Sequence, residues 1–416
     1  MATGSGLAIV GGGLSTARAI KAFREAGGEE PITLFSRDSA IPYHRPPLSK
    51  RFLRGEAEAS DTLVEPESFY DANACDVRLE TGVSSIDLRE RALVLEDGRR
   101  HSFDKLLIAS GAWPNSLDVP GSKLEGVCTL RTLGDSSWIR DAARDARHAV
   151  VVGAGFIGME VAASLVQLGL EVTLIHRDKG LFEILRARAV AQYLADLYGQ
   201  RGVELVLGDE VASFGGRSRL DSVETKRGRV AQAELAIVGI GVTPATGWLD
   251  GSGLRLNDGV VVNERFETRA VDVWAIGDVA RFYDPVFQRQ RRIEHWSNAN
   301  YMGTEVGRVM AGAEGGYDRV STFFTEVFGI TMKVLGDVDE IDEIVFRGAL
   351  EDGAAIGFYL RGEQLDGCLV VGQDEETENQ LTELIRARAI VHDASRLADE
   401  GMPLEEIFVR ARGGDA

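Results

Sequence analysis

The sequence predicts an α/β protein with two Rossmann-like domains plus a C-terminal α+β domain. Near the N-terminus an apolar strand, a glycine turn, a helix and a second strand follow one another, and the same order returns about 140 residues later. From residue 317 onward the pattern changes to short strands followed by a charged helix. At 416 residues the chain is also too long for a single core. We therefore expect a first domain of residues 1–112 and 247–315, a second of 113–246, and a third of 316–416.

The two repeated units take their strands from short apolar runs. Residues 7–10 and 32–35 predict the strands of the first unit, with a helix over 17–26 between them. Residues 149–152 and 172–175 predict those of the second unit, with a helix that ends near Leu168. Each strand–helix–strand unit nucleates its own parallel sheet, so two parallel-sheet domains follow.

Further strands are expected between and after these units. Apolar runs predict buried strands over 105–111, 233–239 and 273–276, with antiparallel pieces near 253–273. The C-terminal part should contain short strands at 331–335, 344–346, 356–360 and 369–371, and a charged helix over 375–389.

Composition is that of an ordinary globular protein, with 44% hydrophobic and 27% charged residues. Residues 1–6 hold no basic segment or long apolar run, so no secretory signal is expected. No apolar run approaches the roughly 20 residues of a membrane span.

Only three cysteines occur, Cys75, Cys128 and Cys368, far apart and odd in number, which indicates a reducing, cytoplasmic setting.

The charge is acidic and uneven. A net charge of −19 disfavours nucleic acid or an anionic membrane as the main partner. Residues 316–416 hold 22 acidic and 9 basic side chains, so most of the excess lies there. Two short stretches are basic although the chain as a whole is acidic. One contains Arg45, Lys50, Arg51 and Arg54, and the other contains Arg281, Arg289, Arg291 and Arg292.

Two glycine turns predict dinucleotide binding. The second, Gly153-x-Gly155-x-x-Gly158, is complete: the first glycine makes the turn, the second admits a pyrophosphate, and the third lets the helix pack on the strand. The first, Gly11-x-Gly13-x-x-Thr16, has threonine in the third position, so helix and strand must sit slightly farther apart or the backbone must adjust. A turn between strand and helix without a ligand is the plain alternative, especially for the first motif.

A third motif lies at 274–280, where a strand ends in Gly277 and an aspartate, Asp278, stands at the mouth of a following helix. The plain interpretation is that Asp278 caps that helix, since Asp is a preferred N-cap. The functional interpretation is a carboxylate that accepts hydrogen bonds from the ribityl chain of a flavin. The two interpretations are compatible.

Four segments together carry a family resemblance: residues 41–50 (Ile-Pro-Tyr-His-Arg-Pro-Pro-Leu-Ser-Lys), the second glycine turn continuing to Glu160, residues 275–278 (Ala-Ile-Gly-Asp), and residues 292–296 (Arg-Ile-Glu-His-Trp). On these the sequence resembles the FAD-dependent ferredoxin reductases of oxygenase systems, putidaredoxin reductase among them, and more distantly apoptosis-inducing factor. The resemblance covers essentially the whole chain, in family order. It implies FAD in the first domain, NAD(P)H in the second and an interface role for the third.

The resemblance also implies roles for single residues. Lys50 would lie near the flavin N5 and pair with Glu160, and Trp296 would stand where electrons leave the flavin. These three are the expected catalytic residues. The FAD contacts it implies are Gly11, Gly13, Arg45, Lys50, Arg131, Gly277, Asp278, Glu294, His295 and Trp296; the NAD(P)H contacts are Gly153, Gly155, Gly158 and Glu160. The plain alternative is solvated surface charge for Lys50 and Glu160 and ordinary core for Trp296.

Two departures from the family pattern stand out. The acidic residue that binds the FAD ribose is replaced by Arg37, so Asp38, one place along, is the expected substitute. The C-terminal aromatic-Ser-Asp-Gln run that faces the flavin is here Ser-Thr-Phe-Phe-Thr-Glu-Val at 321–327, which leaves the polar contacts on that side and the partner open.

The expected function is electron transfer from NAD(P)H through FAD to a small iron–sulfur protein, an acidic [2Fe-2S] ferredoxin. No cysteine lies in the 40–55 region, which argues against a dithiol relay, and three dispersed cysteines cannot hold a cluster. Six scattered histidines give no metal-ligand spacing. The basic stretch at 289–292 is expected to steer the acidic partner.

Alternative functions are those of a redox-responsive NADH-binding protein similar to apoptosis-inducing factor, or of an NAD(P)H oxidase or quinone reductase. The sequence leaves both a monomer and a homodimer open as the oligomeric state.

Nucleotide choice depends on the residues after the strand that ends at Ile175. One position after this strand contacts the 2′ group of the adenosine ribose. In one register His176 and Arg177 lie there, which favours NADPH. In the other register Asp178 lies there, which favours NADH because a carboxylate binds the 2′-hydroxyl and repels a 2′-phosphate. Both positions lie near the spacing of about 20 residues from the glycine turn. The resemblance tips the expectation to NADH, with NADPH possible.

Overall fold

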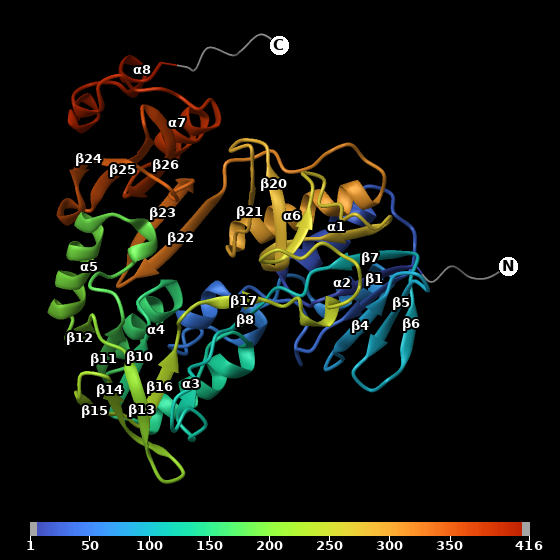
Figure 1. Ribbon diagram of the computed structural model, residues 1–416, viewed down its shortest axis with the longest axis horizontal. Helices are drawn as coiled ribbons and strands as arrows, with labels where there is room; N and C mark the ends of the chain where they lie inside the picture. Colours follow the sequence, from blue (N-terminus) through green and yellow to red (C-terminus); the bar gives the residue numbers. More distant parts are fainter. Residues whose placement is uncertain (1–5, 410–416) are drawn as a thin grey trace.

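The computed structural model describes residues 6–409, which form three large sheets with helices packed against them (Figure 1). Residues 1–5, on which the expected absence of a signal sequence partly rests, lie outside the described residues, as do residues 410–416. Over the described stretch, no helix unites the length and the hydropathy that a bilayer crossing requires.

The first sheet is parallel and has the order β19-β7-β1-β2-β3. Its strands are β1 (Leu7–Val10), β2 (Ile32–Phe35), β3 (Cys75–Arg78), β7 (Lys105–Ile108) and β19 (Val273–Ala275). Helix α1 (Leu14–Glu25) follows β1, and the short α2 (Glu67–Ala72) precedes β3. Val10 pairs with both Phe35 and Ile108, so the strands end at one edge, where the first glycine turn begins.

The second sheet repeats this plan with the order β12-β11-β10-β16-β9, again parallel. Its strands are β9 (Val127–Cys128), β10 (His148–Val152), β11 (Glu171–His176), β12 (Glu204–Leu207) and β16 (Leu235–Val238). Its helices are α3 (Leu133–Asp145), α4 (Phe156–Gln167) and α5 (Arg188–Gln200). Val152 pairs with Ile175 and Val238, so the second glycine turn also begins at a carboxyl edge.

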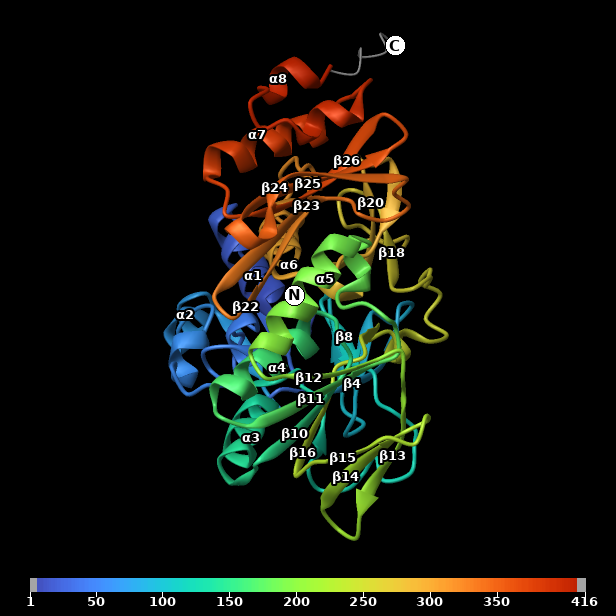
Figure 2. The same ribbon diagram turned by 90° about the vertical axis from the view of Figure 1, so that its left-hand side faces the viewer.

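The third sheet is antiparallel, in the order β22-β23-β26-β25-β24. Its strands are β22 (Thr322–Val327), β23 (Ile330–Gly336), β24 (Glu343–Ala349), β25 (Ala354–Arg361) and β26 (Gln364–Val371), with α7 (Glu375–Arg386) and α8 (Leu404–Ile407) after them. Figure 2 shows this part stacked above α4 and α5, and β22 contacts both α4 and α6 (Trp296–Met310). A shared apolar core joins the third sheet to α4 and α5.

Four smaller sheets complete the fold. They comprise β4 (Val83–Asp87), β5 (Ala92–Leu95) and β6 (Arg100–Ser102); β13 (Val211–Gly216), β14 (Leu220–Thr225) and β15 (Val230–Gln232); β8 (Ala112–Pro114) with β17 (Val242–Pro244); and β18 (Val260–Val262), β20 (Ala280–Asp284) and β21 (Arg289–Arg291). The chain passes between the first and second large sheets twice, and β8 and β17 are these two crossings, paired antiparallel.

This region differs in part from the sequence expectation. Antiparallel pieces were expected near 253–273, and isolated antiparallel bridges join Leu256 to Val260 and Glu267 to Trp274. Strand β18, however, pairs in parallel with β20, a partner that follows β19 in the chain. The plain interpretation of Asp278 as the N-cap of a helix is wrong, because Asp278 lies in a single 3-10 turn, Gly277–Val279, and strand β20 follows directly. The carboxylate of Asp278 is therefore not used by a helix.

Helices α1 and α6 pack closely because α6 presents two glycines to α1. A Cβ on Gly303 would come within 2.3 Å of the Ser15 carbonyl oxygen, and one on Gly307 within 2.5 Å of the Ala19 carbonyl oxygen. Neither position can hold a larger residue without moving the helices apart. Trp296, the first residue of α6, is thereby placed relative to the glycine turn that precedes α1.

We expect Gly303→Ala to lower the free energy of unfolding by about 1–3 kcal/mol, since a buried methyl would overlap main-chain atoms of α1. Gly199 in α5 is the matched control because no atom lies within 4 Å of a Cβ added there. Gly199→Ala should be neutral or stabilise by up to about 1 kcal/mol through helix propensity. Thermal unfolding of the two variants measures this, and equal shifts would contradict the close packing.

Candidate functional site

One cavity of about 1220 Å³ lies where the three large sheets meet. Its wall includes both glycine turns, the segment from Tyr43 to Lys50, the turn at Gly277, and residues of β22. Of the expected site residues it contains all except Asp38 and Gly158. Segments more than 300 residues apart in the sequence therefore contribute to a single chemical environment.

The first glycine turn presents a helix N-terminus to this cavity. Gly11 has φ +118°, and a Cβ there would come within 2.1 Å of the Ala109 carbonyl oxygen. Gly13 is the N-cap of α1 and carries no side chain that could cap it, so the amide groups of the first turn face the cavity. Thr16, which replaces the third glycine, donates its hydroxyl to the Gly11 carbonyl oxygen at 2.5 Å. This hydrogen bond is how the structure accommodates the altered motif.

Beside this turn, a cluster of charges surrounds Asp278. Arg131 Nη2 donates to Asp278 Oδ2 at 2.6 Å, and Arg45 adds a second positive charge. Burial acts to raise the pKa of Asp278, but the two guanidinium groups outweigh it and hold the pKa below its usual value. Asp278 is therefore an ionised acceptor in the cavity wall.

Unpaired donors in this cluster test whether FAD would fit. The Nε atoms of Arg45 and Arg131 are buried and have no hydrogen-bond partner among residues 6–409. A Cβ on Gly13 would meet nothing nearer than Arg45 Nη1 at 4.0 Å, so the glycine leaves open space in front of the helix. Buried donors without acceptors are costly. A large ligand rich in oxygen acceptors, with a diphosphate, fits these residues.

The buried Lys50–Glu160 pair lies where three segments meet. Lys50 Nζ is 2.7 Å from Glu160 Oε2, and both side chains are almost fully buried. Ser49, the last residue of a 3-10 turn over Pro46–Ser49, donates its hydroxyl to the same oxygen at 2.5 Å. Thr325 of β22 donates to Glu160 Oε1 at 2.9 Å. The plain alternative of two solvated surface charges is wrong.

The second glycine turn has the geometry that a nucleotide site requires. Gly153 has φ +103°, and no atom lies within 4 Å of a Cβ added to Gly155, the N-cap of α4. A Cβ on Gly158 would come within 1.9 Å of the Gly153 carbonyl oxygen, so Gly158 serves the contact between helix and strand and does not line the cavity. The turn thus leaves space for a diphosphate at a helix N-terminus.

At the end of β11, His176 connects the glycine turn to Asp178. The Ala154 amide donates to His176 Nδ1 at 3.3 Å, so the ring proton is assigned to Nε2, which lies 3.3 Å from Asp178 Oδ2. Burial lowers the pKa of His176, which keeps the ring neutral. Arg177 Nε is 3.5 Å from the same carboxylate oxygen, and its side chain is mostly exposed.

Aromatic rings close the inner and outer ends of the cavity. Inside, His295 stacks on Phe323 with 4.1 Å between ring centroids, and Phe156 packs edge-on against both. Burial lowers the pKa of His295 to about 4, so the ring is neutral near pH 7. At the outer end Trp296 Nε1 donates to His44 Nδ1 at 2.9 Å, and 37% of Trp296 is exposed. Trp296 is thus a rim residue, and the plain alternative of ordinary core is wrong.

Asp38 lies outside the cavity wall, and its carboxylate is already hydrogen-bonded to another side chain. It accepts a hydrogen bond at 2.6 Å from the hydroxyl of Tyr43, which does line the cavity. Arg37 pairs with Glu96 and lies over the Trp113 ring, 5.5 Å from its centroid. The ribose contact of Asp38 stays a prediction.

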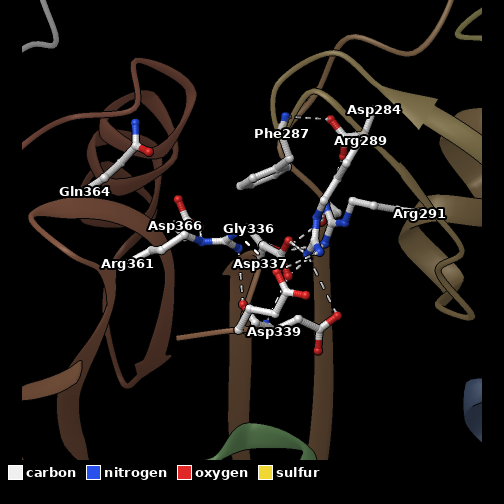
Figure 3. A network of polar contacts seen from close by, with 12 residues as sticks. Asp284, Phe287, Arg289, Arg291, Gly336, Asp337, Asp339, Arg361, Gln364 and Asp366 are labelled. Atoms are coloured by element: carbon white, nitrogen blue, oxygen red, sulfur yellow. Dashed lines mark hydrogen bonds and ion pairs between the residues drawn. The ribbon is translucent and has the colours of Figure 1, made fainter. Parts of the chain in front are cut away.

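The basic stretch at 289–292 is not a free positive surface. Figure 3 shows Arg289 and Arg291 surrounded by carboxylates; Arg291 Nη1 is 2.8 Å from the fully buried Asp284, and Arg289 pairs with Asp337. Arg292 pairs with Glu294 and with Asp258, the latter at 3.1 Å. The expectation that this stretch steers an acidic partner is therefore wrong, because internal carboxylates neutralise its charge.

Several residues around the site were not anticipated from the sequence. They are Ser49 and Thr325 on Glu160, His44 on Trp296, and the cavity rings of Phe156 and Phe323. Ser49 and His44 stand inside the 41–50 motif, so that motif was a usable signal for them. Thr325 and Phe323 lie in the segment noted only as a departure from the family pattern.

The three thiols take no part in this cavity. Within the described residues the cysteines form no disulfide, and none of them is in the cavity wall. Burial raises the pKa of Cys75 and of Cys128 to about 12, and that of Cys368 also rises. Thiols held protonated in this way are poor nucleophiles.

Comparison with known proteins finds similar sequences and structures over nearly the whole chain. Residues 5–303 match the family model described as pyridine nucleotide-disulphide oxidoreductase, and residues 322–408 match the reductase C-terminal family. The ferredoxin–NAD(+) reductase subunit of the benzene 1,2-dioxygenase system of Pseudomonas putida is 33% identical, with 98% of each chain covered. Putidaredoxin reductase of the same species is 30% identical over 97% of each chain. The solved structure of the covalent putidaredoxin reductase–putidaredoxin complex matches with a TM-score of 0.91 at 30% identity, covering 96% of this chain and 97% of that one.

We expect Asp278→Asn to weaken FAD binding by about tenfold, because a neutral amide is a poorer hydrogen-bond acceptor and leaves Arg131 and Arg45 without their counter-charge. The change should appear as a higher Kd when FAD-free protein is titrated with FAD and flavin fluorescence is followed. Asp250→Asn, at an exposed position outside the cavity, is the matched control. Unchanged affinity in Asp278→Asn would contradict the assignment of this carboxylate.

Proposed function

The chain belongs to the pyridine nucleotide-disulphide oxidoreductase family, and on that premise we propose that it carries electrons from NADH through FAD to a small iron–sulfur protein. One observation carries the proposal: two glycine turns and the Lys50–Glu160 pair line a single cavity. The curated relatives named above, a ferredoxin–NAD(+) reductase subunit and putidaredoxin reductase, support the same reaction. The buried, protonated cysteines argue against a thiol relay.

We assign the two nucleotides to different parts of the chain. FAD binds residues 1–112 and 247–315, with its diphosphate at the N-terminus of α1, and NADH binds residues 113–246, with its diphosphate at the N-terminus of α4. The amide groups of each helix N-terminus supply donors and a favourable dipole for the phosphates. Arg45 and Arg131 donate to FAD oxygens, and Asp278 accepts from hydroxyls of its ribityl chain.

FAD, when bound, supplies the redox chemistry: it accepts two electrons as a hydride from the nicotinamide and can release them singly. The protein contributes position and charge. Lys50 places a positive charge where negative charge develops during reduction, and Glu160 fixes the position of that ammonium group. The neutral His295, with Phe156 and Phe323, forms a wall of packed rings on one side of the cavity.

Electrons leave at the rim where Trp296 and His44 meet. Trp296 and the neighbouring Phe324 are among the few large hydrophobic side chains that stay exposed, at 37% and 39%. Exposed aromatic residues at a cavity mouth suit a transient protein contact. We propose an acidic [2Fe-2S] ferredoxin as the partner, a cytoplasmic setting, and a monomer or homodimer as the active unit.

Anaerobic stopped-flow spectroscopy tests the proposed function. NADH should bleach the flavin absorbance, and a [2Fe-2S] ferredoxin added afterwards should restore it as the cluster is reduced. Electrons that reach only oxygen or a quinone would instead make the protein an oxidase or quinone reductase. Slow bleaching with no ferredoxin reduction, accompanied by a change in conformation or dimerisation, would indicate a redox-responsive binding protein.

The nucleotide preference should depend on Asp178. Its carboxylate is partly exposed in the cavity wall and is oriented by the neutral His176, so it can accept from a 2′-hydroxyl and repel a 2′-phosphate. We expect Asp178→Ala to lower kcat/KM for NADH about tenfold and to shift the NADH/NADPH ratio toward NADPH. Arg177→Ala is the companion variant. An unchanged ratio in Asp178→Ala, with a strong shift toward NADH in Arg177→Ala, would identify an NADPH enzyme.

A further inference from the structure

The Glu160 carboxylate, on α4, receives donors from two other parts of the fold. Oε2 takes the Lys50 ammonium at 2.7 Å and the Ser49 hydroxyl at 2.5 Å, both from the segment beside the first glycine turn. Oε1 takes the Thr325 hydroxyl at 2.9 Å, from β22 of the C-terminal sheet. Glu160 itself lies on α4, one turn after the second glycine motif begins the helix.

The two oxygens are not equivalent. Within residues 6–409, Thr325 is the one donor to Oε1, while Oε2 has two. Glu160 is 5% exposed and Thr325 is 2% exposed, so water is largely kept from both. A buried carboxylate oxygen without a donor is costly. A Glu160 that lost Thr325 would therefore rotate to share the remaining donors, and the Lys50 ammonium would shift with it.

We propose that Thr325 is a positioning residue for hydride transfer: through Glu160 it fixes the Lys50 ammonium against the flavin, so that the C-terminal domain completes the reducing site. The inference rests on the proposed function. It gives the altered 321–327 segment a role, since a threonine hydroxyl on β22 supplies the contact to Glu160. Thr325 touches neither the flavin nor the nucleotide in this role; it acts only through Glu160.

Thr325→Val tests this because valine keeps the shape and removes the donor. We expect flavin reduction by NADH at saturating nucleotide to slow about three- to tenfold, the scale of one ordinary intramolecular hydrogen bond, because Thr325 acts only through Glu160. The KM for NADH should change little, since the nucleotide contacts are elsewhere. The midpoint potential of bound FAD, measured by spectroelectrochemistry without nucleotide, should fall because Lys50 stabilises the reduced flavin less well.

Two further variants separate positioning from packing. Thr325→Ser keeps the hydroxyl and should restore both the rate and the potential toward wild type. Thr382→Val is the matched control: the Thr382 hydroxyl also makes one hydrogen bond, to the Glu378 carbonyl oxygen on α7, in the same domain but outside the cavity. It should leave the rate and the potential unchanged.

A Thr325→Val protein with wild-type rate and potential would overturn the inference. So would equal losses in Thr325→Val and Thr382→Val, which would indicate general loosening of the domain. If Thr325→Val does not fold with FAD, Thr325→Cys replaces it, because cysteine has a similar volume and is only a weak donor. The rate of flavin reduction and the midpoint potential of bound FAD are then compared in the same way. A wild-type protein that NADH fails to reduce would refute the proposed function instead, and the potentials would still decide the role of Thr325.

Discussion

The burial of one carboxylate, that of Glu160, sets the relative placement of the three parts of this protein. Removing an ion pair from water costs several kcal/mol for each ion, and this cost is offset only when the oxygens are saturated with donors. Here the donors come from the turn over Pro46–Ser49 and the residue after it, and from β22, while Glu160 belongs to α4. If α4 or the 46–50 segment moved, a buried charge would lose its partner, and if β22 moved, a buried carboxylate oxygen would lose its donor. The donors that make the buried pair tolerable belong to segments of the cavity wall, so these contacts also hold the wall segments in place.

The features predicted correctly from the sequence are those that depend on neighbouring residues. Strands β1 and β2 begin and end where their apolar runs do, because central strands of a parallel sheet are buried on both faces. Both glycine turns lie at strand ends, as their spacing indicates. The charged C-terminal helix was placed less well: it ends at Arg386, short of the expected residue 389, and Arg388 adopts φ +51°.

The features that sequence reasoning missed depend on contacts between distant residues. Four arginines within twelve positions predict a basic surface, and only the fold shows that Asp258, Asp284 and Asp337 pair with all four. The parallel pairing of β18 with β20, and the donation from Thr325 to a glutamate 165 residues earlier, have no local signal either. In the same way Asp278 has the sequence context of a helix cap, but the strand that follows it frees its carboxylate for the cavity.

The close approach of α1 and α6 has a consequence for electron flow. Gly303 and Gly307 bring α6 against the main chain of α1, and interiors packed this tightly move as one body. The first glycine turn precedes α1, and Trp296 at the rim begins α6. The two crossings, β8 and β17, join this body to the second large sheet. The distance from this turn to the rim is therefore set by the contact between two helices and does not depend on the placement of the second large sheet.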